Sequence, residues 1–166
     1  MRPWLRWCVK ALPLTLLMAC TEQAAYESPV PAYNVQYSCN ISTINAAMEQ
    51  TDLPNLDCQP GMVLINQYRN LSEVIGVCGL LLYHAATDDV YYAYDLACPY
   101  CYQHGAHRAI KMKDPFTAQC PDCKSEFGAV QYGSPAPTAG PANQENFHLR
   151  QYRARLANYS TLVVSR

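Results

Sequence analysis

Two cysteine pairs of the same form have the spacing of a metal site. They are Cys98-Pro99-Tyr100-Cys101 and Cys120-Pro121-Asp122-Cys123, and eighteen residues separate Cys101 from Cys120. Two thiolates three residues apart on a tight turn can point at one ion, and two such turns complete a tetrahedron. The proline in each pair restricts the turn and lowers the entropy that is lost when the sulfurs are ordered. We therefore predict that Cys98, Cys101, Cys120 and Cys123 hold one metal centre together.

Two other uses of this region stay open. The first pair is similar to the Cys-Pro-Tyr-Cys active site of glutaredoxins, where it opens a helix whose N-terminus lowers the thiol pKa. The residues that follow Cys101 predict a poor helix, with Gly105 inside it, so a thiol–disulfide oxidoreductase is the second alternative function. His104 and His107 could replace a sulfur ligand or shield the site, although exposed loop histidines are the favoured interpretation.

A longer pattern resembles Rieske-type domains. It comprises Tyr94-Asp95-Leu96-Ala97-Cys98-Pro99, Cys120-Pro121-Asp122-Cys123-Lys124-Ser125-Glu126-Phe127, Gly133, Pro135, Gly140-Pro141-Ala142 and Leu149-Arg150-Gln151-Tyr152. The resemblance covers roughly residues 61 to 165 and implies an all-β fold, a small antiparallel β-sandwich with a two-loop metal-binding subdomain. In that family, each loop supplies one cysteine and one histidine to a [2Fe–2S] cluster.

The resemblance assigns roles to individual residues and also shows where this chain differs. Cys98 and Cys120 fall on the two cysteine ligands, and Cys123 falls on the second histidine. Cys101 lies one place beyond the first histidine position, which is Tyr100 here. Ser125 falls on the serine that hydrogen-bonds a cluster sulfide, so it is the predicted cofactor-binding residue. Because both histidines are replaced, the high reduction potential of a Rieske centre is not expected.

The first nineteen residues predict a secretory signal peptide. A positive start with Arg2, Arg6 and Lys10 precedes an apolar run over residues 11 to 19, about half of the roughly 20 residues that a membrane-spanning helix needs. The run ends Leu17-Met18-Ala19-Cys20, which resembles the lipobox of bacterial lipoproteins. That resemblance implies lipidation of Cys20 and a cell-envelope protein anchored to a membrane, facing the periplasm or the exterior. A plain signal peptide with an incidental cysteine is the alternative.

The export signal bears on the identity of the metal. Four thiolates suit zinc, mononuclear iron or an all-cysteine [2Fe–2S] cluster. Export of an unfolded chain disfavours a cluster assembled in the cytosol, whereas zinc can be acquired outside. Structural zinc is the first expectation, an iron–sulfur electron-transfer protein is the alternative, and a metal-free, disulfide-bonded state stays open in an oxidising compartment. No Ser-His-Asp order, phosphate loop or pair of carboxylates is recognisable, so a non-enzymatic role is favoured.

The rest of the chain has the length of one domain. Residues 20–32 contain Pro29 and Pro31, lack hydrophobic periodicity and are expected to form a flexible tether, so the β domain is assigned to residues 33–166. Without residues 1–19 the chain has nine basic and thirteen acidic residues, and no dense basic stripe. Nucleic acid is therefore not an expected partner. The membrane is expected through the lipid, and the sequence names no protein partner.

Apolar alternation predicts several strands. Val35 to Ile41 alternates as a half-buried strand does, and Gly61 to Asn66 is a short apolar run. Residues 75–83 and 90–96 predict one hairpin, with Gly76 and Gly79 at a bulge or close backbone approach. Residues 149–156 and 161–164 predict a second hairpin. Ile44 to Gln50 is the one segment expected to be helical.

Three cysteines remain beyond Cys20 and the two pairs. Cys39 lies on the apolar face of its expected strand, Cys78 lies in an apolar run and Cys58 lies in a loop. Exported proteins tend to pair their thiols, so a Cys39–Cys58 disulfide is the favoured pairing. Cys39 and Cys78 as small core residues are the alternative.

Overall fold

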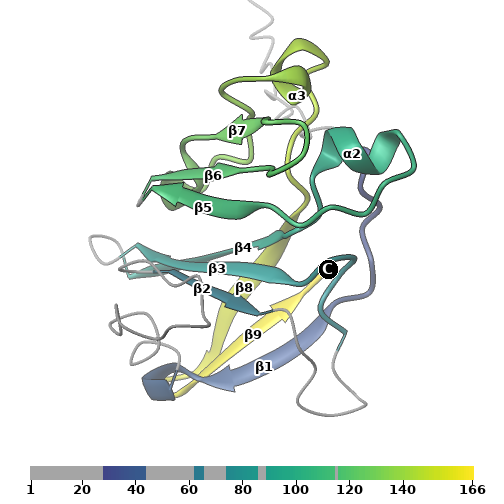
Figure 1. Cartoon of the computed structure of the whole chain (residues 1–166). Helices are drawn as coiled ribbons and strands as arrows, with labels where there is room; N and C mark the ends of the chain where they lie inside the picture. Colours follow the sequence, from purple (N-terminus) through teal and green to yellow (C-terminus); the bar gives the residue numbers. More distant parts are fainter. Residues whose placement is uncertain (1–27, 44–61, 66–73, 86–88, 115) are drawn as a thin grey trace, which may run out of the picture.

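A computed structural model describes residues 28–43, 62–65, 74–85, 89–114 and 116–166 (Figure 1). The regular structure consists mainly of short strands joined by turns, with a few single-turn helices. The elements in chain order are β1 (Gln36–Asn40), β2 (Met62–Ile65), β3 (Leu80–Ala85), β4 (Val90–Asp95), α2 (Pro99–Gln103), β5 (Lys111–Asp114), β6 (Thr117–Gln119), β7 (Glu126–Phe127), the 3₁₀ turn η1 (Val130–Tyr132), α3 (Pro141–Gln144), β8 (Gln151–Asn158) and β9 (Thr161–Ser165). Within this part of the chain no helix is long and apolar enough to span a membrane.

The strands form two antiparallel sheets. The larger sheet has the order β1-β9-β8-β4-β3-β2, and the smaller has the order β5-β6-β7. Every pairing between described strands is antiparallel. The prediction of an all-β, antiparallel fold is confirmed.

The predicted strands and hairpins are present with shifted ends. In β1 the side chains of Tyr37 and Cys39 are buried and their neighbours are exposed, as the alternation predicted. The two predicted hairpins are β3–β4 and β8–β9. The strand expected from residue 75 begins only at Leu80, because residues 76–78 form a turn. Ile44 to Gln50 lies outside the described residues, and its expected helix stays a prediction.

Some elements differ from the sequence-based expectation. The helices α2 and α3 were not predicted, so the expectation of a single helical segment was wrong. Both are only four or five residues long and carry proline at their N-terminal positions, where its fixed φ suits the first helical turn. The small sheet β5-β6-β7 also has no clear sequence signal, since its strands contain two to four residues each. Such short strands give too few alternations to define a period.

Two buried layers hold the sheets together. The large sheet curls, so that β1, β8 and β9 pack against β3 and β4 around residues such as Val35, Leu82, Ala93 and Leu162. The opposite face of β3 and β4 presents Leu81 and Tyr94 to the small sheet. That second core includes Cys98, Cys101 and Cys120 among its buried members. Figure 1 shows β3 and β4 between the small sheet above and β1, β8 and β9 below. The central strands are therefore buried on both faces, and one of these faces carries the cysteine loops.

Asp95, at the end of β4, is a buried polar residue at the junction between the two layers. Its side chain is fully buried and accepts hydrogen bonds from the backbone N–H groups of Val77 at 2.8 Å, Cys78 at 3.3 Å and Ala97 at 2.8 Å. The Tyr152 hydroxyl donates a fourth bond of 2.9 Å from β8. A Cβ atom at Gly76 would overlap this carboxylate, which explains why the turn needs glycine there. Asp95 therefore fixes the turn before β3 and the start of the first cysteine loop.

We expect Asp95→Asn to lower the free energy of unfolding by roughly 3 kcal/mol, because an amide nitrogen cannot accept these bonds and buried donors lose their partners. Asp89→Asn is the matched control. Asp89 contacts His84 at 2.8 Å, but its side chain is 78% exposed, so the change should stay within about 0.5 kcal/mol. Urea unfolding of both variants measures the difference. Equal stabilities would contradict the structural role of Asp95.

Candidate metal centre

The first cysteine pair lies in a loop that leaves the central sheet and returns beside it. Cys98 caps α2, and its carbonyl accepts the Tyr102 N–H at 2.9 Å. The base of the loop is closed by the Ala97–Ala109 bridge and by the Cys98 N–H, which donates to the Arg108 carbonyl at 2.8 Å. The single helical turn brings the Cys98 and Cys101 side chains to one side. Pro99, at the first helical position, fits this turn without costing a backbone hydrogen bond.

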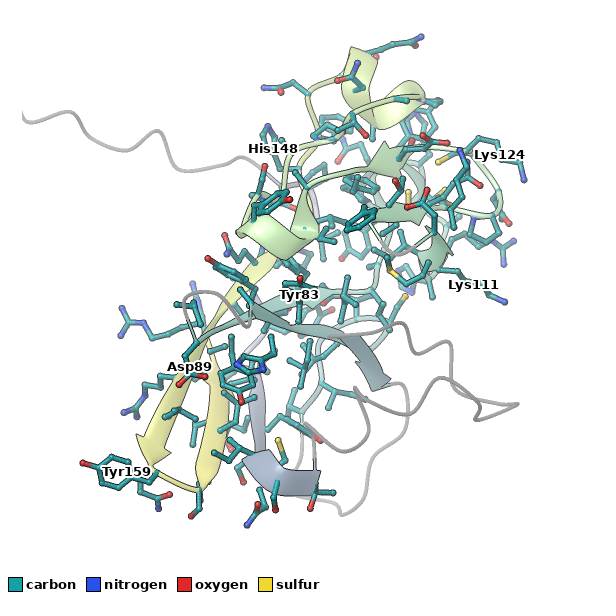
Figure 2. All side chains as sticks on the ribbon, turned by 90° about the vertical axis from the view of Figure 1, so that its left-hand side faces the viewer. Tyr83, Asp89, Lys111, Lys124, His148 and Tyr159 are labelled. Carbon is teal, nitrogen blue, oxygen red and sulfur yellow. The ribbon has the colours of Figure 1, made fainter. Side chains whose placement is uncertain are left out.

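The second cysteine pair forms the tip of the β6–β7 hairpin. The Cys120 N–H donates to the Ser125 carbonyl at 2.9 Å, and the Lys124 N–H donates to the Cys120 carbonyl at 3.1 Å. Lys124 closes the turn in a left-handed conformation, with φ of 62°. Figure 2 shows Lys124 at the right-hand edge of the molecule, above Lys111 of β5. A hairpin tip thus holds Cys120 and Cys123, three residues apart in sequence, with both sulfurs available to one metal ion.

The two loops bring all four predicted sulfurs together. The Sγ atoms of Cys98, Cys101, Cys120 and Cys123 lie within 4.8 Å of one another. Two of the separations cross between the loops at 3.5 Å, from Cys98 to Cys123, and at 3.6 Å, from Cys101 to Cys120. Around a tetrahedral zinc ion with Zn–S bonds of about 2.3 Å, neighbouring sulfurs lie about 3.8 Å apart. The four-cysteine cluster could therefore hold one metal ion.

Burial and hydrogen bonds between the sulfurs shift the pKa values of the thiols in different directions. A hydrogen bond from the Cys98 thiol, with further bonds from the backbone N–H groups of Cys123 and Asp122, lowers the pKa of Cys120 to about 5. The same Cys98–Cys120 bond, followed by burial, raises the pKa of Cys98. Burial first, and then hydrogen bonds to the neighbouring sulfurs, raise the pKa of Cys101 to about 12. A cation that binds here would replace the protons of these thiols.

Ser125 lies directly against the second loop. It is fully buried, and its Oγ lies 3.1 Å from the Sγ of Cys123. The same oxygen accepts the Ala142 N–H at 2.9 Å. Because that bond uses an acceptor site of the hydroxyl, the Ser125 proton stays available to a Cys123 thiolate. Ser125 therefore contacts a sulfur of the cluster, and its role in binding a cofactor stays a prediction.

The loop over residues 140–142 belongs to the Rieske-like pattern. The sequence alone does not predict its contact with the site. Gly140 has φ of 77°, and a Cβ there would collide with the Lys124 carbonyl and the Ser125 backbone. Only glycine lets this loop approach closely enough for Ala142 to bond Ser125. The signal that could have found it is the Gly-Pro pair, since proline next to glycine marks a fixed turn.

The remaining polar groups near the site are more exposed. His104 packs on Tyr100 and its Nδ1 lies 2.8 Å from the Tyr100 carbonyl, while His107 stacks on Tyr102. Neither histidine belongs to the sulfur cluster, and both are exposed. Arg108 forms an ion pair with Asp122 across the two loops at 2.5 Å. Both side chains are about half exposed, so this pair adds little to stability.

The other predicted site residues are not in this cluster. Cys39 is buried in the core of the large sheet. Cys58 and Cys20 lie outside the described residues, so the Cys39–Cys58 disulfide and the lipidation of Cys20 stay predictions. Cys78 lies in the turn that Asp95 holds, and burial, followed by the charge of Asp95, raises its pKa.

Comparisons with protein-family models, with curated proteins and with solved structures find no match to this chain.

Ser125→Ala should lower the affinity of the cysteine cluster for zinc about tenfold, because it removes a hydroxyl that orients and stabilises the Cys123 thiolate. Competition with a chromogenic chelator measures the affinity. Ser134→Ala is the matched control, since the Ser134 Oγ also accepts a backbone N–H, that of Ala136 at 3.3 Å, but lies outside the two loops. Equal affinities for the parent protein and Ser125→Ala would show that the serine does not act on the site.

Proposed function

We propose that this chain is an exported, membrane-anchored lipoprotein with a Rieske-like domain, whose four cysteines bind one structural zinc ion. The observation that carries the proposal is the convergence of four sulfurs, all within 4.8 Å of one another, from two separate loops. A closed tetrathiolate site leaves no position for a substrate, so its role is to hold the loops together. In this proposal the ion replaces a large core in the small subdomain.

The compactness of the cluster favours one ion over two. In a [2Fe–2S] centre, two irons and two sulfides lie between the ligand pairs, so sulfurs on different irons must stand further apart than sulfurs on one ion. The pairs that approach to 3.5 and 3.6 Å each take one sulfur from each loop, and the remaining separations stay below 4.8 Å. This spacing supports a mononuclear centre. Zinc is favoured over mononuclear iron because the expected export of an unfolded chain leaves metal acquisition to the outer compartment.

The Rieske-like part of the proposal is supported by the division of the strands into a large sheet and a small one. A large antiparallel base carries a small sheet, and the two cysteine loops follow β4 and β6. Ser125, which falls on the serine that bonds a cluster sulfide in that family, lies beside the cluster here and contacts the Sγ of Cys123. Four cysteines in place of two cysteines and two histidines make the centre a ligand variant of that arrangement. A variant of this kind would keep the scaffold without its high-potential cluster.

Protein purified from the exporting compartment should contain one zinc ion per chain and should be colourless. Cys101→Ser and Cys120→Ser should each lose the ion, because three thiolates leave the tetrahedron open. Cys78→Ser should keep it, since Cys78 lies outside the cluster. Elemental analysis with a visible absorption spectrum measures both properties. A chromophore that bleaches reversibly on reduction and depends on Cys101 would overturn zinc and establish an electron carrier.

The anchor is proposed from Leu17-Met18-Ala19-Cys20. Cys20→Ser should move the protein from the membrane fraction to the soluble fraction of the cell envelope, because the acyl chains that hold it are then absent. Cys39→Ser is a control that keeps every residue of the lipobox. Fractionation followed by mass spectrometry of the N-terminal peptide reports both location and lipid. If parent and variant both fractionate as soluble protein, the chain is not lipid-anchored.

A further inference from the structure

The segment that leads into β1 is fixed to the end of the molecule that carries the metal centre. Val30 is fully buried, and Arg150 donates to two carbonyls of this segment: Nε to Val30 at 2.7 Å and an Nη to Ser28 at 2.9 Å. Hydrogen bonds from a guanidinium are among the stronger ones. The segment therefore starts at a defined place on the domain.

That place is beside α2 and α3. Ser28 and Pro29 line one surface hollow together with Gln103, at the end of α2, and with residues 145–147, just after α3. Gln103 follows Cys101 by two residues, and α3 begins with the loop whose Ala142 bonds Ser125. The start of the described chain is thus adjacent to both sides of the metal centre.

The opposite end of the molecule is the β8–β9 turn. Tyr159 in this turn is fully exposed, and the turn lies next to the far end of β1, where Asn40 pairs with Thr161. Figure 1 shows β1 running away from α2 and α3 toward this end, and Figure 2 shows Tyr159 and Lys124 at opposite extremes. The domain therefore has a metal end, where its chain starts, and a far end.

The length of chain between Cys20 and Ser28 limits how far the metal end can be from a lipid on Cys20. Eight residue steps span at most about 28 Å when fully extended. The bonds from Arg150 prevent residues 28–30 from adding to this reach. A lipid on Cys20 would keep the metal end near the bilayer, whereas the β8–β9 turn, at the other end of the domain, could lie further away.

We propose that the α2–α3 end faces the phospholipid headgroups and holds the metal centre at the membrane surface, with the β8–β9 turn directed away. This inference rests on the lipid anchor of the proposed function. The exposed residues of α3 and the turn after it are Asn143, Gln144, Glu145 and Asn146, which are polar and carry one charge. Such a surface suits the hydrated headgroup layer without insertion into the acyl chains.

The chain offers a clean probe of this orientation. Its only tryptophans, Trp4 and Trp7, lie in the expected signal, so the processed protein contains none. Gln144→Trp places a single tryptophan on α3, and Tyr159→Trp places one at the far turn. The lipidated variants are reconstituted into vesicles of neutral phospholipid that contain a dansyl headgroup lipid, and energy transfer from tryptophan to dansyl is measured. The parent protein supplies the background and verifies that the signal is absent.

Gln144→Trp should show at least twice the transfer efficiency of Tyr159→Trp. A Gly/Ser insertion after Gln23, as long as the segment from Cys20 to Ser28, should lower the transfer from Gln144→Trp. The insertion lengthens the reach of the anchor without altering the domain. Equal or reversed efficiencies on vesicle-bound protein would overturn the orientation and leave the anchor intact. Protein that does not float with the vesicles would overturn the anchor, and the orientation with it.

Discussion

The packing of four sulfur atoms, three of them on buried cysteines, into one small volume is the constraint on which the metal end depends. Cys98 and Cys120 are fully buried, and Cys101 is nearly so. Four thiolates would repel one another strongly in a site with little water. A divalent cation resolves the conflict, because it neutralises the charge and fixes the directions of all four sulfurs. The two loops can then be held together by bonds instead of by a large apolar interface.

The small sheet shows why such a link is useful. β7 has two residues and β6 has three, and the buried side chains that they contribute are Ala118 and Phe127. A unit of this size buries too little apolar surface to be stable alone and needs a staple such as a metal site. The large sheet contributes further contacts that hold this unit in place. The hydroxyl of Tyr94 reaches across from β4 to the Val130 carbonyl at 3.0 Å, and Asp95 fixes the start of the first loop.

The sequence predicted the parts of this structure that depend on short-range patterns. Alternation located β1 and both hairpins, and the cysteine spacing identified the four residues whose sulfurs converge. It did not reveal α2 or the small sheet, because a five-residue helix and two-residue strands are stabilised by tertiary contacts and leave no period. The Asp95 bonds were also invisible, since their donors Val77 and Tyr152 are distant in sequence. The family resemblance placed Ser125 beside the centre but did not predict its contact with Cys123.

The central claim is that one ion is bound by all four cysteines. X-ray absorption spectroscopy at the metal edge of the purified protein tests it most directly, because the fine structure reports the number, type and distance of the ligands around the absorbing atom. If all four cysteines bind one zinc ion, we expect four sulfur ligands at about 2.3 Å around zinc and no second metal in the outer shells. A nitrogen or oxygen ligand in place of a sulfur, or a metal–metal vector, would contradict it.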